Sequence, residues 1–443
     1  MKTDTNLSMD DNRLSKDGWK VMILLFILQV INFGDKAVIG FASVPIIKEF
    51  GLTSVQWGLI GSAFFWLFSV SSIIGGALSD YTGTKRVLSV MGAVWSVIQF
   101  ATLFAFSFPY LLITRVILGA GEGPALAVAF SQANKWLPRH RVGIGLAMLV
   151  VAGSLGPAIF APLFTHLISS YGWRSAFLAM GIIGVTWLVL WMWLAKERPE
   201  SVDMSDLKPN AKKESHSASW SEVFPTFRSK NFILITLCGF AAYCGVALNL
   251  FWVPNYLVNV HGVNAGFVAM IWIVAALGQV GFGALSDRIY QKTQSIRKSR
   301  VHLLGPLMIL VGICYYLAAV IDSGWLALIF LSLAALYAVW FSVGPNIAME
   351  LVPPEHHGKV TGTLMALVTL GGIIAPYATG WIVENSANQA EGFSHMFQLV
   401  ALMFLIFGGL LWIGVRPKER TIESDSLQSV YYAERSNKAD SHL

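Results

Sequence analysis

Charged residues and cysteines are both scarce in this sequence. Only 13% of its 443 residues are Asp, Glu, Lys or Arg, where soluble domains carry about 25%, and 55% of the residues are apolar. A soluble globule of this composition would aggregate. The three cysteines, Cys238, Cys244 and Cys314, all lie within long apolar stretches. We therefore expect them to be packing residues, and we predict neither a disulfide framework nor a metal site.

Motifs of enzymatic chemistry are also missing. The chain contains no HExxH, GxSxG or P-loop pattern. His356 and His357, beside Glu355, fall in a predicted loop, where solvated histidines are far more common than metal ligands. The basic residues are dispersed over many segments, which argues against a nucleic-acid partner. We predict that the protein is not an enzyme and carries no cofactor.

Apolar runs of membrane-spanning length are what the sequence has in abundance. A transmembrane helix needs about 20 mostly apolar residues, and twelve such runs occur, six on each side of a polar stretch. This pattern predicts an all-α integral membrane protein with twelve transmembrane helices in two six-helix bundles. The runs cover residues 18–41, 55–78, 87–106, 109–134, 142–168, 173–195, 231–258, 265–285, 302–321, 325–350, 359–384 and 395–415.

The distribution of Lys and Arg predicts the orientation of these helices. Membrane proteins concentrate Lys and Arg in their cytoplasmic segments. If both termini are cytoplasmic, all but four of the 31 Lys and Arg residues lie on that side or in its tails. The exceptions are Lys48 and Arg174 on the opposite face, and Lys36 and Arg115 within the membrane. We expect a multi-pass protein of the cell (plasma or inner) membrane with both termini cytoplasmic.

Composition also indicates the domain organisation. Residues 196–230 are rich in charge, Ser and Pro, and they are too few to form a catalytic domain. We predict a cytoplasmic linker there, with a short surface helix near residues 220–227. The predicted organisation is an N-terminal tail at 1–17, a six-helix bundle at 18–195, the linker at 196–230, a second six-helix bundle at 231–416 and a C-terminal tail at 417–443.

Four ionisable side chains fall inside predicted spans: Asp35, Lys36, Arg115 and Glu122. A charge at the bilayer centre costs about 2.5 to 3.5 kcal/mol, so these side chains should face an aqueous cavity or one another. Interhelical salt bridges that never touch a substrate are one interpretation, but buried ion pairs are a poor source of stability. The four charges sum to zero, so an anion is accommodated best when a carboxyl group takes up a proton. This favours symport of protons and an anion.

The pentapeptide Gly-Ala-Leu-Ser-Asp occurs at residues 76–80 and again at 283–287, each time where an apolar run meets a basic turn. Such repetition indicates two halves of similar construction. The first copy, continued through Lys85 and Arg86, resembles the signature loop of the major facilitator superfamily, and the second is its weaker echo. The resemblance implies an inner gate made by Gly76, Asp80, Gly83, Lys85, Arg86, Asp287 and Arg288.

Three further segments resemble the anion:cation symporter family, and the likeness extends over about residues 20–416. They are Asp35-Lys36 in the first helix, residues 115–124 in the fourth helix and residues 172–177 at the start of the sixth. The resemblance implies that Asp35 and Glu122 couple transport to protons, and that Lys36 and Arg115 recognise the substrate carboxylate. The implied partners are a small organic anion, protons and the lipid bilayer.

The chain departs from that family at substrate-facing positions. Relatives usually have Arg where this chain has Lys36, and a point charge reads carboxylate geometry less strictly than a planar guanidinium. Sugar-acid members tend to have tyrosines where this chain has Phe33 and Phe68, and an asparagine near Thr369. The loss of these polar groups favours a more apolar or aromatic acid over a polyhydroxylated one.

The leading hypothesis is therefore an alternating-access, proton-coupled importer of a small organic anion, an aromatic acid or a sugar acid, working as a monomer. A proton-coupled exporter of drugs or metabolites is the alternative, because Gly153, Gly156 and Pro157 partly match the glycine–proline motif of antiporters. A receptor that transports nothing would not need charges on two helices inside the membrane.

Overall fold

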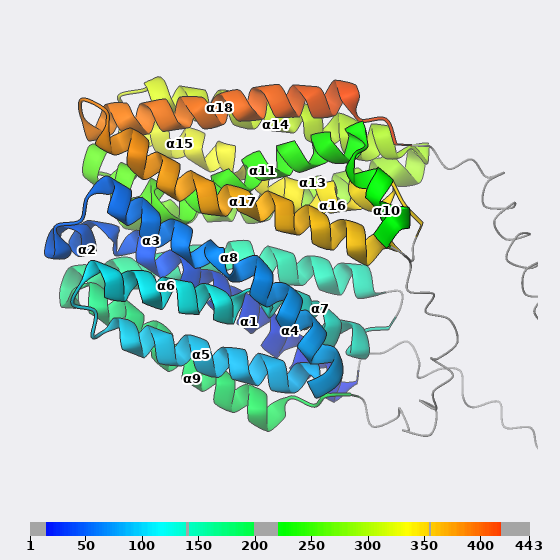
Figure 1. The fold of residues 1–443 in the computed structure, drawn as a ribbon, viewed down its shortest axis with the longest axis horizontal. Coiled ribbons are helices and arrows are strands. Elements are labelled where there is room, and N and C mark those ends of the chain that lie inside the picture. Colours follow the sequence, from blue (N-terminus) through cyan, green and yellow to red (C-terminus); the bar gives the residue numbers. More distant parts are fainter. Residues whose placement is uncertain (1–14, 139–140, 199–219, 354–355, 418–443) are drawn as a thin grey trace, which may run out of the picture.

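Every regular element in the described part of the chain is a helix. The computed structural model describes residues 15–138, 141–198, 220–353 and 356–417. Eleven helical segments there are long and apolar enough to cross a membrane. The twelfth span is α5 (Thr84–Thr102), which lies alongside the others but begins with Lys85 and Arg86, and these lower its mean hydropathy (Figure 1). The predicted all-α membrane fold is confirmed.

Six spans form the first half of the chain, and three of them are interrupted, so the half contains nine helices. Pro124, for example, lies at the break between α6 and α7. The elements are α1 (Lys16–Phe41), α2 (Ser43–Phe50), α3 (Ser54–Trp66), α4 (Phe68–Thr82), α5, α6 (Phe108–Glu122), α7 (Ala125–Trp136), α8 (Val142–Tyr171) and α9 (Trp173–Leu194).

The second half begins with α10 (Trp220–Phe227), a short helix before the first span of that half. Six further spans follow, several of which contain short 3₁₀ or π turns. They are built from α11 (Lys230–Phe251), α12 (Val253–Asn255), η3 (Tyr256–Val260), η4 (Ala265–Val268), α13 (Ala269–Thr293), η5 (Arg297–Val301), α14 (His302–Val320), α15 (Gly324–Ala334), η6 (Ala335–Ala338), α16 (Val339–Met349), α17 (His357–Glu384) and α18 (Gln389–Gly414).

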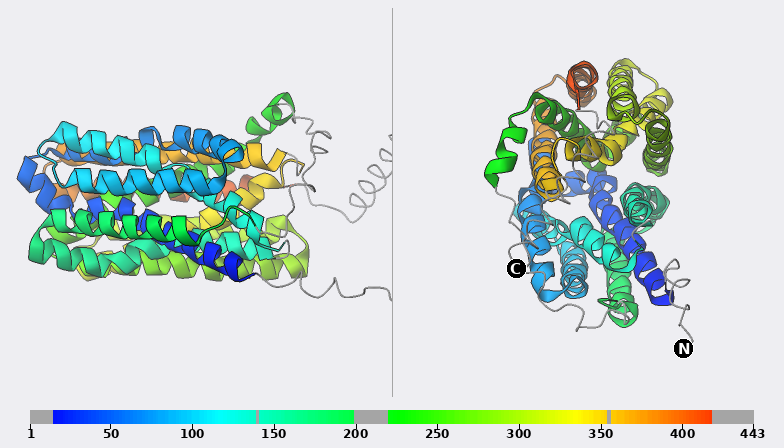
Figure 2. Two further views of the ribbon diagram at one scale, coloured as in Figure 1. Left: turned by 90° about the horizontal axis from the view of Figure 1, so that it is seen from below. Right: turned by 90° about the vertical axis from the view of Figure 1, so that its right-hand side faces the viewer.

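The spans run roughly parallel along the long axis of the molecule, with the first half on one side and the second half on the other (Figure 1). The beginning of α1, the end of α18 and the linker helix α10 all lie at one end, which we call the terminal end (Figure 2). The opposite end, where α2 meets the start of α3, is the far end. An even number of spans places both ends of the described chain at the same end.

The two halves contact each other mainly from the far end to the middle of the molecule. There α3 packs against α17, α2 against α12, and the end of α8 against η4. Toward the terminal end, α4 and α7 pack chiefly on other helices of the first half, and α16 packs on helices of the second half. The two halves are therefore packed together at the far end. At the terminal end, α4, α7 and α16 pack mainly within their own halves.

At the seam between the halves, the backbones of α3 and α17 approach each other closely. Gly58 of α3 lies so near α17 that an added methyl group would overlap the carbonyl oxygen of Pro376. Nearby, the Val55 amide donates a hydrogen bond to the Glu384 carboxylate at 2.7 Å, which joins the start of α3 to the end of α17. A glycine at this position allows the two helices to touch backbone to backbone.

An ion pair also fixes the far end of the first half. The Arg174 guanidinium at the start of α9 contacts both oxygens of Glu49 in α2, at 2.7 and 3.0 Å, and the Trp173 indole donates to the same carboxylate at 2.7 Å. Arg174 also donates to the carbonyl oxygens of Leu103 and Ala105. Hydrogen bonds from Arg174 hold the pKa of Glu49 below its usual value.

We predict that Glu49→Gln lowers the melting temperature at neutral pH by a small amount. The pair is partly exposed, so solvent screening limits its contribution to about 1 kcal/mol or less. Because the pKa of Glu49 is lower in the folded protein than in the unfolded chain, its stabilisation is present above the unfolded value and disappears as the pH falls through the folded value. The difference in melting temperature between wild type and variant should shrink below about pH 4. A difference that stays constant down to that pH would contradict this account.

Candidate functional site

A buried ion pair lies at the centre of the first half. The Lys36 ammonium of α1 is 3.2 Å from Oε2 of Glu122 at the end of α6, and the two side chains are only 5% and 0% exposed. Asn32, one turn before Lys36, donates a hydrogen bond to the same Glu122 oxygen at 3.0 Å and accepts one from Lys36. The structure thus brings together one residue predicted to bind the anion and one predicted to carry the proton.

Phenylalanine rings surround the Lys36 ammonium. The ring centres of Phe33, Phe68 and Phe64 lie 4.4, 5.4 and 5.9 Å from Nζ, within the range of cation–π attraction. Phe33 and Phe68 are the two positions that the sequence singled out. Phe64 was not predicted, although it precedes Phe68 by one helical turn and so shares its face. The cation therefore sits among apolar rings rather than hydroxyl groups.

Gly119 in α6 and Gly123 directly after α6 explain why α3 and α4 come so close to the pair. A methyl group at Gly119 would overlap the carbonyl oxygen of Phe64, and one at Gly123 would overlap that of Phe68. The backbones therefore touch on either side of Glu122, which places both rings beside Lys36. Small residues allow such close contacts between transmembrane helices.

The other two intramembrane charges lie deeper in the first half. Asp35 and Arg115 are each 1% exposed. Arg115 donates to the Thr102 hydroxyl at 3.5 Å, and its guanidinium is 5.6 Å from the ring of Phe177. Neither charge forms an ion pair with any described residue. Asp35 lies against Gln99 and near enough to Arg115 and Glu122 to interact electrostatically.

The structure does not bring the four predicted charged residues into one cluster. Lys36 and Glu122 are in direct contact, whereas Arg115 faces α5 and α9 inside the first half. Arg115 can influence the Lys36–Glu122 pair through its field, but in this conformation no contact joins its guanidinium to Lys36 or to the surrounding rings. Direct recognition of the substrate by Arg115 stays a prediction.

Thr369 of α17 lies on the opposite side of the seam. Its hydroxyl donates to the Met365 carbonyl oxygen at 2.7 Å and lies next to the Tyr243 side chain of α11. Tyr243 contacts Phe65 of α3, with ring centres 5.7 Å apart, and Phe65 contacts Phe68 at 6.0 Å. A continuous series of aromatic rings thus connects the second half to the rings around Lys36.

The glycine–proline segment of α8 packs on α1. A methyl group at Gly153 would contact the ring of Phe33, and one at Gly156 would overlap the carbonyl oxygen of Val30. Pro157 lies inside the continuous helix α8. The segment that suggested an exporter therefore helps to position a ring beside Lys36.

The first Gly-Ala-Leu-Ser-Asp copy ends a helix at the terminal end, and the second does not. α4 ends at Thr82, and Gly83 follows with a φ of +92°, a conformation that favours glycine. In contrast, α13 continues past Asp287 and Arg288 to Thr293.

Four charged residues of the predicted inner gate are exposed, and they form no ion pair with a described residue: Asp80, Arg86, Asp287 and Arg288. Lys85 donates to the Met192 carbonyl oxygen at 3.0 Å. A methyl group at Gly76 would meet no neighbouring atom.

The carboxylate at the start of α5 belongs to Glu197, which follows α9. It accepts hydrogen bonds from the Lys85 amide at 2.7 Å, the Thr84 amide at 3.0 Å and the Thr84 hydroxyl at 2.9 Å, and it pairs with Lys135. Partial burial alone would raise the pKa of Glu197, but the bonds from Lys135, Lys85 and Thr84 outweigh burial and hold that pKa below its usual value. Glu197 therefore ties the signature loop to α7 and α9.

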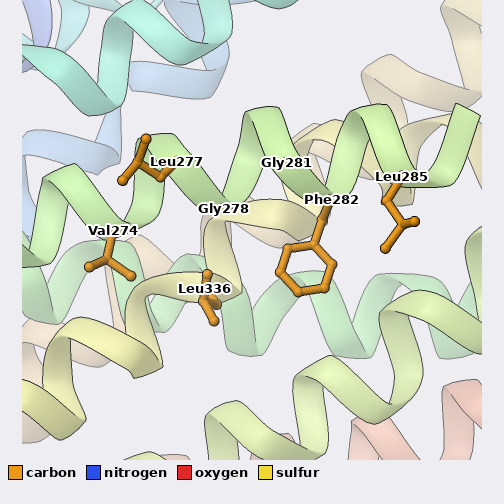
Figure 3. A pocket seen from close by; sticks show the side chains of 7 residues that line it. All are labelled: Val274, Leu277, Gly278, Gly281, Phe282, Leu285 and Leu336. Carbon is orange, nitrogen blue, oxygen red and sulfur yellow. The ribbon is translucent and has the colours of Figure 1, made fainter.

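A shallow apolar groove of about 320 Å³ follows α13 where it meets η6 (Figure 3). It contains no charged side chain and does not include Lys36 or Glu122, so it lacks the charge that binding an anion would require. Its lining residues are Val274, Leu277, Gly278, Gly281, Phe282, Leu285 and Leu336.

Comparison with known proteins identifies the family. The family model of the Major Facilitator Superfamily matches residues 25–344, with a second match at residues 299–429. This chain belongs to that superfamily. It is 30% identical over 422 residues to a hexuronate transporter of Bacillus subtilis, with 91% of this chain and 96% of the relative covered. It is 29% identical over 412 residues to a probable sulfoacetate transporter of Cupriavidus necator, with 89% and 90% covered.

Solved structures show the same fold. A bacterial homologue of the human lysosomal transporter Spinster, inward-facing and unoccupied, matches with a TM-score of 0.75 at 20% identity, over 91% of this chain and 98% of that one. A D-xylose–proton symporter matches with a TM-score of 0.70 at 18% identity, over 91% and 99%. The chain is therefore a multi-pass membrane transporter of the Major Facilitator Superfamily, and its relatives are transporters rather than enzymes, as the sequence predicted.

We predict that Glu197→Gln lowers the melting temperature of this transporter, because the α5 amides lose a charged acceptor and Lys135 loses its partner. Loss of a helix N-terminal cap costs about 0.5 to 2 kcal/mol. Asp80→Asn is the matched control, since it neutralises a carboxylate of the same loop that has no ion pair among described residues. The measurement is the melting temperature of each purified variant, compared with that of the wild type. An equal loss in Asp80→Asn would show that Glu197 is not the principal cap.

Proposed function

We propose that this transporter imports a small organic anion together with protons. The observation that carries the proposal is the contact of 3.2 Å between Lys36 and Glu122 in buried, apolar surroundings. An anion that binds Lys36 competes with the Glu122 carboxylate for the same ammonium group. Burying two carboxylates beside one cation is unfavourable, so binding of the anion favours a protonated Glu122. This exchange couples the anion to a proton.

The conformation supports a reaction cycle of alternating access. The excess of Lys and Arg in segments at the terminal end supports a cytoplasmic location for that end and for both termini. The closed seam at the far end would then face the outside, and the buried site would be reached from the cytoplasm. We propose that residues 18–195 and 231–416 rock against each other around Lys36, in the cell membrane and within one monomer. In this scheme Asp35 and Arg115 tune the proton affinity of Glu122 by their fields.

The surroundings of Lys36 favour a substrate with an apolar or aromatic body and one carboxylate. Three phenyl rings lie beside the cation, and the next polar groups along the series of rings, Tyr243 and Thr369, belong to the second half. Relatives are named for hexuronate and sulfoacetate, which are both organic anions. A polyhydroxylated sugar acid would leave its hydroxyl groups facing carbon at Phe33 and Phe68, which costs affinity.

We expect Glu122→Gln to abolish accumulation driven by a proton gradient while sparing exchange of labelled for unlabelled substrate. The amide retains the shape of the side chain but carries no proton between the two sides. In proteoliposomes the internal-to-external substrate ratio should fall to about one, which is equilibration without coupling. Glu49→Gln, a neutralised carboxylate outside the spans, should accumulate substrate as the wild type does. Accumulation by Glu122→Gln would refute the proton role, and accumulation driven outward would favour the exporter.

We expect Phe68→Tyr to shift the preference from an aromatic acid toward a sugar acid. The added hydroxyl provides a hydrogen-bond partner beside Lys36, which corresponds to roughly a tenfold change in the ratio of uptake rates. Phe104→Tyr is the control, because Phe104 is 73% exposed in the described fold and has no contact with Lys36. Competition of the two labelled acids in uptake assays measures the ratio. An unchanged ratio in Phe68→Tyr would contradict the proposed substrate class.

A further inference from the structure

The linker helix α10 presents large aromatic side chains outward. Trp220 is 61% exposed and Phe224 is 54% exposed, while Val223 between them is fully buried against the second half. Exposed Trp and Phe on one short helix would be unfavourable in water. In a membrane protein such residues are typical of the boundary between lipid and water, although Trp is the more characteristic of the two.

A cation accompanies each of these rings. The Arg228 guanidinium lies 4.9 Å from the ring centre of Phe224, and the Lys359 ammonium lies 5.2 Å from that of Trp220. Neither cation forms an ion pair with any residue in the described ranges. Each retains N–H donors that are free to bind an oxygen acceptor, because a cation–π contact uses only the face of the ring.

The position of α10 matches the depth of lipid headgroups. The helix lies on the rim of the bundle, across the terminal ends of neighbouring spans (Figure 2). It contacts α11, which begins at Lys230, and α17, which begins at His357. Both of these helices enter the membrane from this level, so α10 lies where the spans begin. Long basic side chains at the ends of spans commonly reach the interface.

A close polar contact attaches α10 to the start of α17. Oε2 of Glu222 is 3.3 Å from Nε2 of His356, and the imidazole is 7% exposed. Lys359 belongs to α17 itself, so the cation beside Trp220 comes from the helix that forms the seam with α3. A ligand held by Arg228 and Lys359 would therefore contact both the linker helix and α17.

We propose that α10 and the first turn of α17 form a binding surface for the headgroups of anionic phospholipids in the cytoplasmic leaflet. Trp220 and Phe224 enter the interfacial layer, and Arg228 and Lys359 bind phosphate oxygens. The cytoplasmic leaflet carries the negative surface charge of the membrane, which complements these two cations. The proposal depends on a cytoplasmic terminal end and is independent of the transported substrate.

The test measures phospholipid binding to the full-length protein in detergent by native mass spectrometry. Dioleoylphosphatidylglycerol is titrated against dioleoylphosphatidylcholine, which has the same acyl chains without the net negative charge. For the wild type we expect tighter binding of the phosphatidylglycerol. A basic residue near an anionic lipid surface contributes about 1 kcal/mol, so Arg228→Gln/Lys359→Gln should weaken the tightest phosphatidylglycerol site by about 30-fold and leave phosphatidylcholine binding unchanged.

Lys292→Gln/Lys298→Gln is the matched control, because it removes two exposed basic residues from the same end without touching α10. It should retain the tightest phosphatidylglycerol site. Trp220→Ala/Phe224→Ala should weaken both lipids, since the rings supply contact that does not depend on charge. Equal affinity of the wild type for the two lipids would overturn the proposal. So would an unchanged phosphatidylglycerol affinity in Arg228→Gln/Lys359→Gln, or an equal loss in the control.

Discussion

The buried contact between Lys36 and Glu122 is the interaction on which the rest of this structure depends. Either charge would be costly to bury without the other, and breaking a buried pair by removing one partner costs about 3 to 5 kcal/mol. Asn32 forms hydrogen bonds to both partners, while Oε1 of Glu122 has no hydrogen-bond partner among the described residues, and three phenyl rings lie beside the ammonium group. The pair is therefore stable only while each charge has an opposite charge beside it. We propose that an anion takes the place of Glu122 beside Lys36 when Glu122 takes up a proton, which would give the site a second state of the same net charge.

The fold supplies the close approach that this pair requires. Gly119 and Gly123 bring α6 against the backbone of α3 and α4, so that the rings of Phe64 and Phe68 reach Lys36 from one side. Packing of α8 on α1 brings Phe33 from the other side. The same helix α3 forms the seam with α17 at the far end. Helix α3 therefore takes part both in the site, through Phe64, and in the contact between the two halves.

Much of this fold could be predicted from the sequence, because a membrane-spanning helix requires a long run of apolar residues and such runs can be located from composition alone. The charged residues within the spans could also be identified from the sequence, but their partners could not. Helical spacing relates only residues of one helix. It shows that Asp35 and Lys36 point in different directions, but not that Glu122 contacts Lys36 rather than Asp35. Phe64 could have been found from its spacing to Phe68. Glu197 could not, because its partners Thr84 and Lys85 are more than a hundred residues away in the chain. The signature loop suggested an inner gate, but its sequence does not reveal which carboxylate caps α5.

The most direct test of the central claim is the number of protons taken up when the purified transporter binds its anion. Calorimetric titrations in buffers of different ionisation enthalpy, with no membrane and no gradient, measure this number near neutral pH. If the anion replaces Glu122 beside Lys36, binding should take up about one proton per anion, and Glu122→Gln should take up none. Binding without proton uptake by the wild type would show that the anion and Glu122 do not compete for Lys36, and the proposed coupling of anion to proton would be wrong.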